Sequence, residues 1–486
     1  MMSSMFCLAL LILLAEASQV DKDFSYIDAH QDTYIQRMKD WVHTESDSSN
    51  PDKRQLVIEM MNVAKKLIED IGGSVEVAEL GDQLFPNGQI IPIPPVVLAT
   101  FGSDPEKPTV CFYGHLDVQP AKKADGWDTE PFTLVVKNGN LYGRGTDDDK
   151  GHVLAFLNAI EAVQVNGLPL NVKIILEGME EVGSDGIEEL IKQKKNTFFA
   201  DVDYYVIADT PWVSKTPGIT YGARGDCYFF LEVKGPQRDL HSGVYGGSVY
   251  EPMSDLIYLL DTLVDSSGCI LISGIYDAVA PVTEKEKKLY ENITFNLEEF
   301  KAEVGTTKLL YDTKEDVLMH RWRYPSLSIH GIEGAFSGSG TKTVIPSKVI
   351  GKFSMRQVPN MEPSVVEKQV SDYLMKKFAE RNSPNKLNVT MVIGAKPWIS
   401  SLEEPQYLAA QKAVRKAFGV EADMVRTGGT VPIARTFQDV TGKHVMLLGI
   451  GGPDDALHGQ NEKLSRYNYI GGTKLYAAFI HEFSKL

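Results

Sequence analysis

Cysteine is scarce in this chain, with four residues in 486. Cys7 lies in an apolar N-terminal stretch, so Cys111, Cys227 and Cys269 remain for the rest of the chain. Three cysteines permit at most one internal disulfide and leave one thiol over. Cys111 lies inside the apolar run TVCFYGHLD, where a buried thiol is more typical than a bridge. The sequence therefore excludes a fold that depends on a disulfide framework.

Positive charge is also in deficit, with 49 Lys and Arg against 65 Asp and Glu and a net charge of −16. This balance argues against a nucleic acid or an anionic membrane surface as a partner. Beyond the N-terminal stretch, no apolar run is long enough to span a bilayer. With 43% apolar and 23% charged residues, the composition indicates a globular chain of two or three domains.

The N-terminal stretch has the pattern of a targeting segment. A short apolar run at 6–14 is followed by the small-x-small sequence AEA. We expect a signal peptide at 1–17 and a secreted protein that begins near Ser18. A disordered tail is the alternative, because no Lys or Arg precedes the apolar run. Glycosylation sequons that begin at Asn292 and Asn388 fit an exported protein.

The first half of the chain alternates helical and strand-like patterns. Residues 26–41 and 54–71 are predicted to be helical. The apolar runs PPVVLATFG, TVCFYGHLD, VKIILEG and DYYVIAD then alternate with helical patterns at 151–165 and 187–194. Such alternation predicts an α/β domain with a largely parallel sheet.

From about residue 221 the alternation of strands and helices gives way to a series of strand-like segments. ARGDCYFFLEVKG, SLSIHGIEG, TVIPSKVIGKFSMRQVP and KLNVTMVIG are strand-like, with a helical pattern at 363–381 between the last two. The chain then returns to an α/β pattern. We expect an inserted α+β domain with an antiparallel sheet at 219–392, between two parts of a discontinuous α/β domain at 18–218 and 393–486.

Carboxylates and histidines follow several of the buried runs. In a parallel sheet, the carboxyl ends of the strands are where ligands gather. One imidazole per site with several carboxylates suits zinc or manganese, and such metals serve hydrolysis. The candidate ligands are His115, Asp117, Asp147, Asp148, Asp149, Glu180, Glu181, Asp209 and His458.

The spacing of these residues suggests which of them bind a metal, which orient a ligand and which transfer a proton. His115 and Asp117 point the same way from a strand end, so one can bind a metal while the other orients its ring. Of Glu180 and Glu181, one can bind a metal while the other accepts a proton from water. One acid of the DDD run at 147–149 can bridge two cations, but the sequence leaves the choice open, and a helix N-terminal charge cluster is the alternative.

The motifs HLDVQP, YGRGTDDDKG, EGMEEVGS, RDLHSGVYGG and HGQNEK resemble the M20 family of dinuclear zinc peptidases, and within it the carnosinase branch, which includes non-specific dipeptidases. The likeness covers nearly the whole mature chain. It implies two Zn²⁺ per subunit, with Mn²⁺ as a possible substitute. The roles that the resemblance implies are His115 and Asp209 on one metal, Glu181 and His458 on the other, Asp148 bridging with a cis Asp148–Asp149 peptide bond, Asp117 beside His115, and Glu180 as general base.

The same resemblance makes the inserted segment a lid and dimerisation domain. It implies that His241 reaches into the partner subunit's active site in a homodimer and supports the oxyanion there. Arg356 would hold the substrate's C-terminal carboxylate, and Thr343 and Thr430 would make smaller contacts. The metal ligands Asp209 and His458 would also contact substrate.

The expected activity is hydrolysis of Xaa-His dipeptides such as carnosine, anserine or homocarnosine. Ile393 and Thr430 stand where cytosolic family members have His and Ser, which leaves the preferred side chain open. The alternatives are a broad-specificity dipeptidase that cleaves substrates such as Cys-Gly, and a deacylase of N-acyl amino acids such as N-acetylhistidine. A secreted binding protein without catalysis is a further alternative, although no expected catalytic residue is missing.

Overall fold

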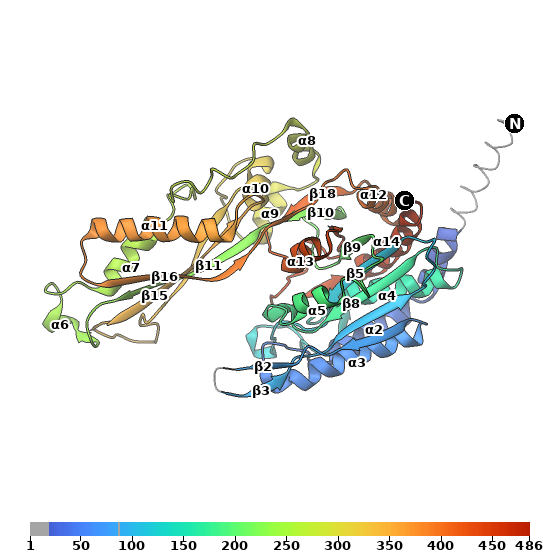
Figure 1. Cartoon of the computed structure of the whole chain (residues 1–486), viewed down its shortest axis with the longest axis horizontal. Helices are drawn as coiled ribbons and strands as arrows, with labels where there is room; N and C mark the ends of the chain where they lie inside the picture. Colours follow the sequence, from blue (N-terminus) through green and yellow to red (C-terminus); the bar gives the residue numbers. More distant parts are fainter. Residues whose placement is uncertain (1–18, 86–87) are drawn as a thin grey trace.

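The computed structural model describes residues 19–85 and 88–486, which form a larger and a smaller domain (Figure 1). The predicted signal peptide lies outside the described residues. Within these ranges, no helix is long and apolar enough to cross a membrane.

A mixed sheet forms the centre of the larger domain. Its strands, in order, are β1 (Ser74–Ala78), β4 (Val96–Phe101), β8 (Asn171–Glu177), β5 (Thr109–His115), β9 (Tyr204–Ile207), β19 (His444–Leu447), β10 (Gly218–Ala223) and β17 (Trp398–Ile399), with β18 (Asp423–Thr427) also paired to β10. The middle strands β8, β5, β9 and β19 are parallel, and antiparallel pairings join β4 and β10 to them. β5 and β8 are buried throughout, as expected for strands covered on both faces. The expected α/β fold with a parallel core is confirmed.

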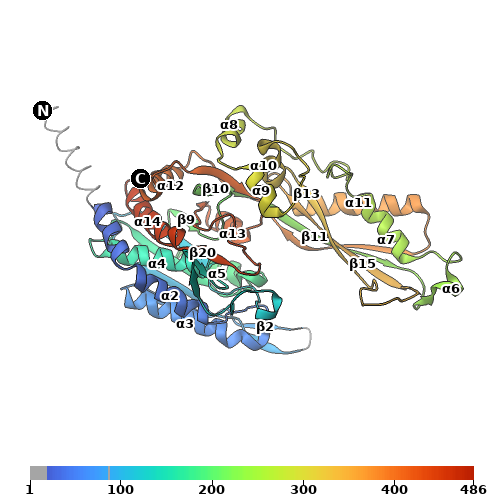
Figure 2. The same ribbon diagram turned by 180° about the vertical axis from the view of Figure 1, so that it is seen from behind.

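Helices cover both faces of this sheet (Figures 1 and 2). One face packs against α2 (Gln31–His43), α3 (Arg54–Asp70), α4 (Lys150–Gln164), α12 (Pro405–Phe418) and α14 (Arg466–Phe483), and the other against α5 (Ile187–Lys194) and α13 (Pro432–Thr441). Helix α4 is apolar almost all round because it lies between the sheet and α14. Phe156 of α4 stacks on Phe112 of β5 with ring centroids 3.9 Å apart. This packing fixes the N-terminus of α4 beside the end of β5.

The helical pattern expected at 26–41 is interrupted in the structure. Residues 19–29 are helical, a turn follows at His30, and α2 then begins at Gln31. The expectation of one continuous helix there is therefore wrong. The helix expected at 54–71 is confirmed as α3, whose buried positions include Val57, Met61, Ala64 and Ile68 at helical spacing.

The smaller domain has an antiparallel sheet with helices on one face. The strand order is β13 (Ser326–Glu333), β15 (Lys348–Gln357), β11 (Gly225–Lys234) and β16 (Lys386–Ala395), and α7 (Pro252–Asp261) and α11 (Pro363–Arg381) cover one side. Burial alternates along β11, with Phe229 and Leu231 in the core under these helices. The other face carries Tyr228 and, on β15, Arg356. The expected α+β insertion is therefore present.

Sheet membership places the domain boundaries a few residues from those expected at 219 and 392. Strand β10, which starts at Gly218, belongs to the larger sheet, and β16 continues in the smaller sheet to Ala395. Strand β17 pairs with β10 and returns the chain to the larger domain. By this criterion the inserted domain runs from β11 to β16.

The charged stretch that begins near residue 283 folds into three helices that contact the larger domain. These are α8 (Glu284–Asn292), α9 (Leu297–Val304) and α10 (Lys314–Trp322). Trp322 packs in a cluster that includes Val425 of β18. Arg323 and Arg426 both donate to Glu286, across 2.9 and 2.8 Å. These contacts hold the segment against the edge of the larger sheet.

Short elements complete the described chain. They are η1 (Pro51–Lys53), β2 (Asp82–Leu84), β3 (Ile90–Pro92), η2 (Lys123–Asp125), β6 (Val135–Lys137), β7 (Asn140–Tyr142), η3 (Glu180–Val182), β12 (Leu240–His241), α6 (Ser242–Tyr245), β14 (Val344–Ile345) and β20 (Lys463–Ser465). Strand β20 pairs with β7, which brings the loop that contains His458 next to the loop before α4.

Candidate metal centre and substrate site

The predicted metal ligands lie together at the carboxyl ends of the parallel strands. His115 ends β5, Asp209 follows β9, and Glu181 lies in η3, directly after β8. Asp148 lies just before α4, and His458 comes from the loop between β19 and β20. Segments more than 300 residues apart in sequence thus meet at one edge of the sheet, as expected for an α/β fold.

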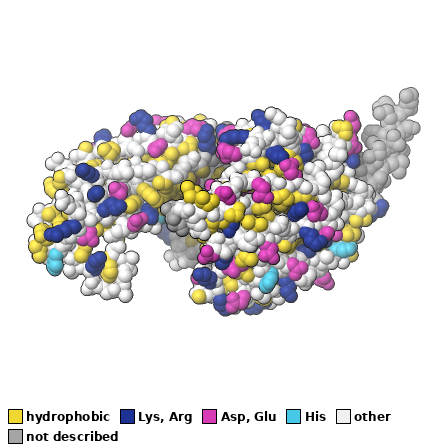
Figure 3. Space-filling view, turned by 60° about the horizontal axis from the view of Figure 1, so that its bottom comes forward, with side chains coloured by type: hydrophobic (Ala, Val, Ile, Leu, Met, Phe, Trp, Pro, Cys, Tyr) yellow, Lys and Arg dark blue, Asp and Glu magenta, His cyan; other side chains and the backbone are white. Residues whose placement is uncertain are grey.

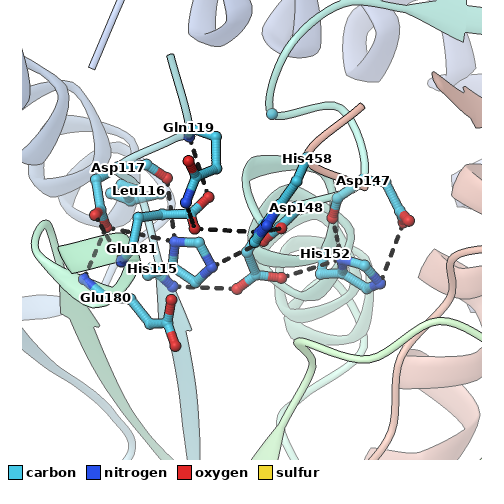
Figure 4. Close-up of polar contacts among 12 residues, drawn as sticks. His115, Leu116, Asp117, Gln119, Asp147, Asp148, His152, Glu180, Glu181 and His458 are labelled. Atoms are coloured by element: carbon cyan, nitrogen blue, oxygen red, sulfur yellow. Dashed lines mark hydrogen bonds and ion pairs between the residues drawn. The ribbon is translucent and has the colours of Figure 1, made fainter. Parts of the chain in front are cut away.

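Asp148 is the acid of the DDD run that lies between the two histidines. Its Oδ1 is 3.0 Å from Nε2 of His115, and its Oδ2 is 2.9 Å from Nε2 of His458 (Figure 4). Asp149 instead contacts His152, with Oδ1 3.0 Å from Nδ1. The backbone oxygen of Asp147 accepts a hydrogen bond from the same ring. The choice that the sequence left open therefore falls on Asp148, and the Asp148–Asp149 peptide bond is cis, as the resemblance implied.

Six side chains form two donor groups, each with its ligand atoms within 4.8 Å of one another. The groups are His115, Glu180 and Asp209, and Asp148, Glu181 and His458. The second group matches the ligand set that the resemblance implied for one metal. In the first, Glu180 accompanies His115 and Asp209, so the expected general base lies within reach of the expected ligands.

Asp117 contacts both His115 at the end of β5 and the acidic pair Glu180 and Glu181 that follows β8. Its Oδ1 is 3.4 Å from Nδ1 of His115. Its carboxylate also accepts from the backbone N–H groups of Glu180 and Glu181, across 3.2 and 3.0 Å. Gln119 donates to Glu181 from its backbone and its side chain, across 3.1 and 2.8 Å. The same ring nitrogen of His115, Nδ1, lies 3.1 Å from the backbone oxygen of Asp117. Asp117 therefore contacts both the imidazole and the backbone of the acidic pair, and both contacts can orient these groups.

Close backbone approach brings β5 onto the start of α4. A Cβ atom on Gly114 would lie 2.4 Å from Cγ2 of Val153 and 2.8 Å from Oδ2 of Asp149. The same Oδ2 accepts the backbone N–H of His115 at 3.1 Å. A larger residue at position 114 would separate the His115 strand from the Asp148 loop.

Glu462 organises the loop of Asp148, and sequence reasoning did not single it out. Its fully buried carboxylate accepts the backbone N–H groups of Gly145, Asp147 and Asp148 at 2.9–3.1 Å and pairs with Arg144 at 2.6 Å. Arg144 also donates to the backbone oxygen of His458 at 3.1 Å. Glu462 stands four residues after His458 in the HGQNEK motif, but nothing in that spacing indicates a buried carboxylate.

The charge pattern of the site fits divalent cations. Burial, together with the nearby Asp148 carboxylate, raises the pKa of Asp209 to about 7. Burial also raises the pKa of Glu180 well above its usual range. Burial opposes the ionisation of Asp148, but hydrogen bonds from His115 and His458 outweigh it and lower the Asp148 pKa. Those bonds require a proton on each facing imidazole nitrogen, and a divalent cation can take the place of that proton between N and O. The donor set therefore suits a metal pair.

The cavity above these residues is about 240 Å³ and also includes Thr430. The Thr430 hydroxyl accepts a hydrogen bond from Nη1 of Arg356 at 2.5 Å. Figure 3 shows the surface hollowed between the two lobes of the molecule. The structure thus joins Arg356 of the smaller domain to Thr430 of the larger domain, which lines this cavity.

His241 and Thr343 are not brought to this site within one chain. They lie at the end of the smaller domain that is remote from the metal centre, next to α6 (Figures 1 and 2). Ser242 donates to the backbone oxygen of Thr343 at 3.1 Å, and Nδ1 of the exposed His241 accepts from Gly243 at 3.0 Å. Ile393, also exposed, lies opposite Tyr228 in the smaller sheet.

The fold and the two donor groups define a metal-dependent hydrolase. The family described as "Peptidase family M20/M25/M40" matches residues 111–482. The chain belongs to this family.

Relatives match the chain along nearly its whole length. Beta-Ala-His dipeptidase from Mus musculus is 55% identical over 476 residues, 97% of each chain. The Cys-Gly metallodipeptidase dug1 from Schizosaccharomyces pombe is 44% identical over 471 residues, 96% of this chain and 99% of the relative. The crystal structure of human carnosine dipeptidase 1 superposes with a TM-score of 0.89 at 53% identity, covering 96% of this chain and 99% of that one. The resemblance stated from the motifs is confirmed, and the enzyme class is that of a metal-dependent dipeptidase.

Proposed function

We propose that this enzyme is a secreted dinuclear-zinc dipeptidase that hydrolyses Xaa-His dipeptides such as carnosine, anserine and homocarnosine. The proposal of two metal ions rests on the position of Asp148. One of its carboxylate oxygens faces the imidazole of His115 and the other faces that of His458. The similarity to Beta-Ala-His dipeptidases supports the substrate class.

In the proposed reaction, residues of this chain would hold the metal pair and transfer the proton. A metal pair would polarise the scissile carbonyl and lower the pKa of water. Glu180, which lies beside His115 and Asp209, would take a proton from the attacking water and pass it to the leaving amine.

Arg356 supplies recognition of the substrate's free carboxylate. Its guanidinium can form two parallel charge-assisted hydrogen bonds to a carboxylate, and Thr430 holds it at the edge of the metal cavity. A fixed cation that binds the C-terminal carboxylate would select short peptides, because a longer chain presents a neutral amide at that position.

A homodimer would complete the site. The exposed His241 lies far from the metal centre of its own chain, so it can serve catalysis only in another copy (Figure 1). In that position its imidazole would donate a hydrogen bond to the developing oxyanion.

Secretion is the part of this proposal that depends on the N-terminal pattern. The side chains of Asn292 and Asn388 are exposed, which leaves both sequons open to glycosylation. Expression of the full chain in animal cells tests this point: we expect protein in the medium that begins near Ser18 and shifts on deglycosylation. Retention in the cell would contradict it.

The substrate class is tested by kcat/KM for carnosine, anserine, homocarnosine, N-acetylhistidine and Cys-Gly, measured side by side. We expect the Xaa-His dipeptides to be cleaved best. Preference for Cys-Gly would indicate the broad-specificity alternative, which the 44% identity to a Cys-Gly metallodipeptidase favours. Preference for N-acetylhistidine would indicate a deacylase.

A further inference from the structure

A second cavity adjoins the metal cavity, and its lining is cationic. It has a volume of about 310 Å³ and shares Thr210, Pro211, Thr427 and Gly429 with the metal cavity. Three arginines line it, Arg224, Arg321 and Arg426, and no Asp or Glu among the described residues does. An acid-free recess is unexpected in a chain with a net charge of −16, and directly beside a cluster of carboxylates.

Only one of these three arginines is paired with an acid. Arg426 pairs with Glu286 at 2.8 Å. The side chain of Arg321, in the last turn of α10, has no hydrogen bond or ion pair among the residues that the structure describes. Its guanidinium carbon lies 4.7 Å from the ring centroid of Phe300 and 6.0 Å from that of Trp322. Aromatic faces hold this cation in place without satisfying its N–H groups.

Arg224 is anchored but not neutralised. It donates to the backbone oxygen of Gly428 at 3.0 Å and to the Ser326 hydroxyl at 2.8 Å, which are uncharged acceptors. Burial, together with the like charges of Arg356 and Arg321, lowers the pKa of Arg224 to about 10, against a smaller opposing effect of Asp226. Burial likewise lowers the pKa of Arg321, against the smaller opposing effect of the Glu303 carboxylate. Within the described part of the chain, neither cation has a carboxylate in direct contact.

We propose that this recess binds a small anion, a carboxylate or another oxyanion, on Arg224 and Arg321. The guanidinium groups would supply charge-assisted hydrogen bonds, and the Thr210 and Thr427 hydroxyls that line the recess are further donors. The site is distinct from Arg356, which lines neither cavity and is held by Thr430. Because the two cavities share four lining residues, the anion is either an acidic side chain on the C-terminal residue of a dipeptide or a free anion that binds beside the substrate.

Arg321→Met is the decisive variant. It removes the charge and keeps an unbranched apolar side chain against the aromatic rings. Arg415→Met is the matched control, because Arg415 is exposed on α12 and pairs with Glu421 away from the recess. Arg321→Lys serves as a second variant should Arg321→Met fail to fold, since it keeps the charge and loses the planar fork.

Binding is measured by calorimetric titration of the metal-loaded enzyme with sodium succinate and with sodium phosphate. Fluorescence of Trp212 and Trp322, which line the recess, gives a second reading. We expect saturable binding that weakens by at least roughly tenfold in Arg321→Met, is intermediate in Arg321→Lys and is unchanged in Arg415→Met. Absence of saturable binding, or equal binding by wild type and Arg321→Met, would overturn the proposal, because any remaining affinity would then belong to the metals.

A second, kinetic experiment identifies the source of the anion. This experiment rests on the proposed dipeptidase function, whereas the binding titration does not. The ratio of kcat/KM for Ala-Glu to that for Ala-Gln is compared between wild type and Arg321→Met. A lower ratio in the variant assigns the recess to an acidic substrate side chain. An unchanged ratio with lost succinate binding assigns it to a free anion. If the wild type cleaves neither dipeptide, the recess does not serve an acidic substrate side chain, and saturable succinate binding assigns it to a free anion. Only failure to cleave the Xaa-His dipeptides as well would contradict the dipeptidase proposal, and the binding titration would still decide the anion site.

Discussion

Arg356 Nη1 donates a hydrogen bond to Thr430 Oγ1 across 2.5 Å. Arg356 belongs to the inserted domain, and Thr430 lies just before α13 of the larger domain. The contact holds a cation from one domain at the rim of the metal cavity of the other. If Arg356 binds the substrate carboxylate as proposed, the position of that carboxylate depends on how the two domains are joined.

Loss of the Arg356 charge should weaken substrate recognition. For Arg356→Gln we expect kcat/KM for carnosine to fall about 10- to 100-fold, mainly through KM, because a charge-assisted pair is lost. Steady-state kinetics with carnosine and with its C-terminal amide measure this. The amide should be a poor substrate for the wild type and should lose little further in the variant. An equal loss for both substrates would contradict carboxylate recognition.

Thr430 provides a matched pair of variants at the same contact. Thr430→Ser keeps the hydroxyl that accepts from Arg356 and should retain near wild-type KM. Thr430→Val keeps the shape, removes the acceptor and should raise KM about five- to tenfold. Equal KM values for the two variants would show that the hydrogen bond does not position Arg356.

Glu180 and Glu181 are adjacent, but their substitution by Gln should have different effects on the enzyme. Glu180→Gln should lower kcat by about 10²- to 10⁴-fold with the metal content unchanged, because only a proton acceptor is lost. Glu181→Gln should lower the metal content itself, because Glu181 lies 3.2 Å from His458 in the second donor group. Metal analysis after dialysis, together with kcat, separates the two. Loss of metal from Glu180→Gln would reassign that residue as a ligand.

The proposed homodimer can be tested by complementation. His241→Ala and Glu180→Gln should each be nearly inactive alone. Mixed after dissociation and reassociation, half of the dimers are heterodimers in which one site has both residues, so about a quarter of wild-type activity should return. A mixture that stays inactive would mean that His241 does not act across a dimer interface.

The buried pair of Arg144 and Glu462 should stabilise the fold. The side chains are 3% and 0% exposed, and the pair is 2.6 Å long. Arg144→Met leaves the Glu462 charge without its partner, so we expect about 3–5 kcal/mol less stability to unfolding. Denaturant unfolding of the metal-stripped protein measures this. Arg415→Met, which breaks an exposed ion pair of 2.7 Å, should change the stability little. Equal losses of stability in Arg144→Met and Arg415→Met would contradict the role of burial.

The α/β core and the positions of the ligands could be predicted from the sequence. Apolar runs that end in His115, Glu177 and Ile207 are buried strands, and parallel strands bring the residues after their carboxyl ends to one edge of the sheet. The choice of Asp148 over Asp147 and Asp149 needed either a resemblance or coordinates, since all three are buried next to one another.

Other features depend on contacts that have no local pattern. Glu462 matters because the chain returns past Arg144 more than 300 residues away in sequence. The helices α8 to α10 lie in a charged stretch whose few apolar residues pack on Val425 of another domain. The cationic recess forms only where Arg224 and Arg321 meet, from β10–β11 and from α10. Tertiary packing, and not periodicity, creates all three.

The most direct test of the central claim is carnosine hydrolysis against metal content. The enzyme is stripped of metal, reloaded stepwise with zinc or manganese, and compared with Glu180→Gln at each step. We predict that the stripped enzyme is inactive, that activity returns as the second equivalent binds, and that Glu180→Gln binds both equivalents without turnover. Full metal occupancy without cleavage of carnosine or the other dipeptides, or undiminished activity in Glu180→Gln, would contradict it.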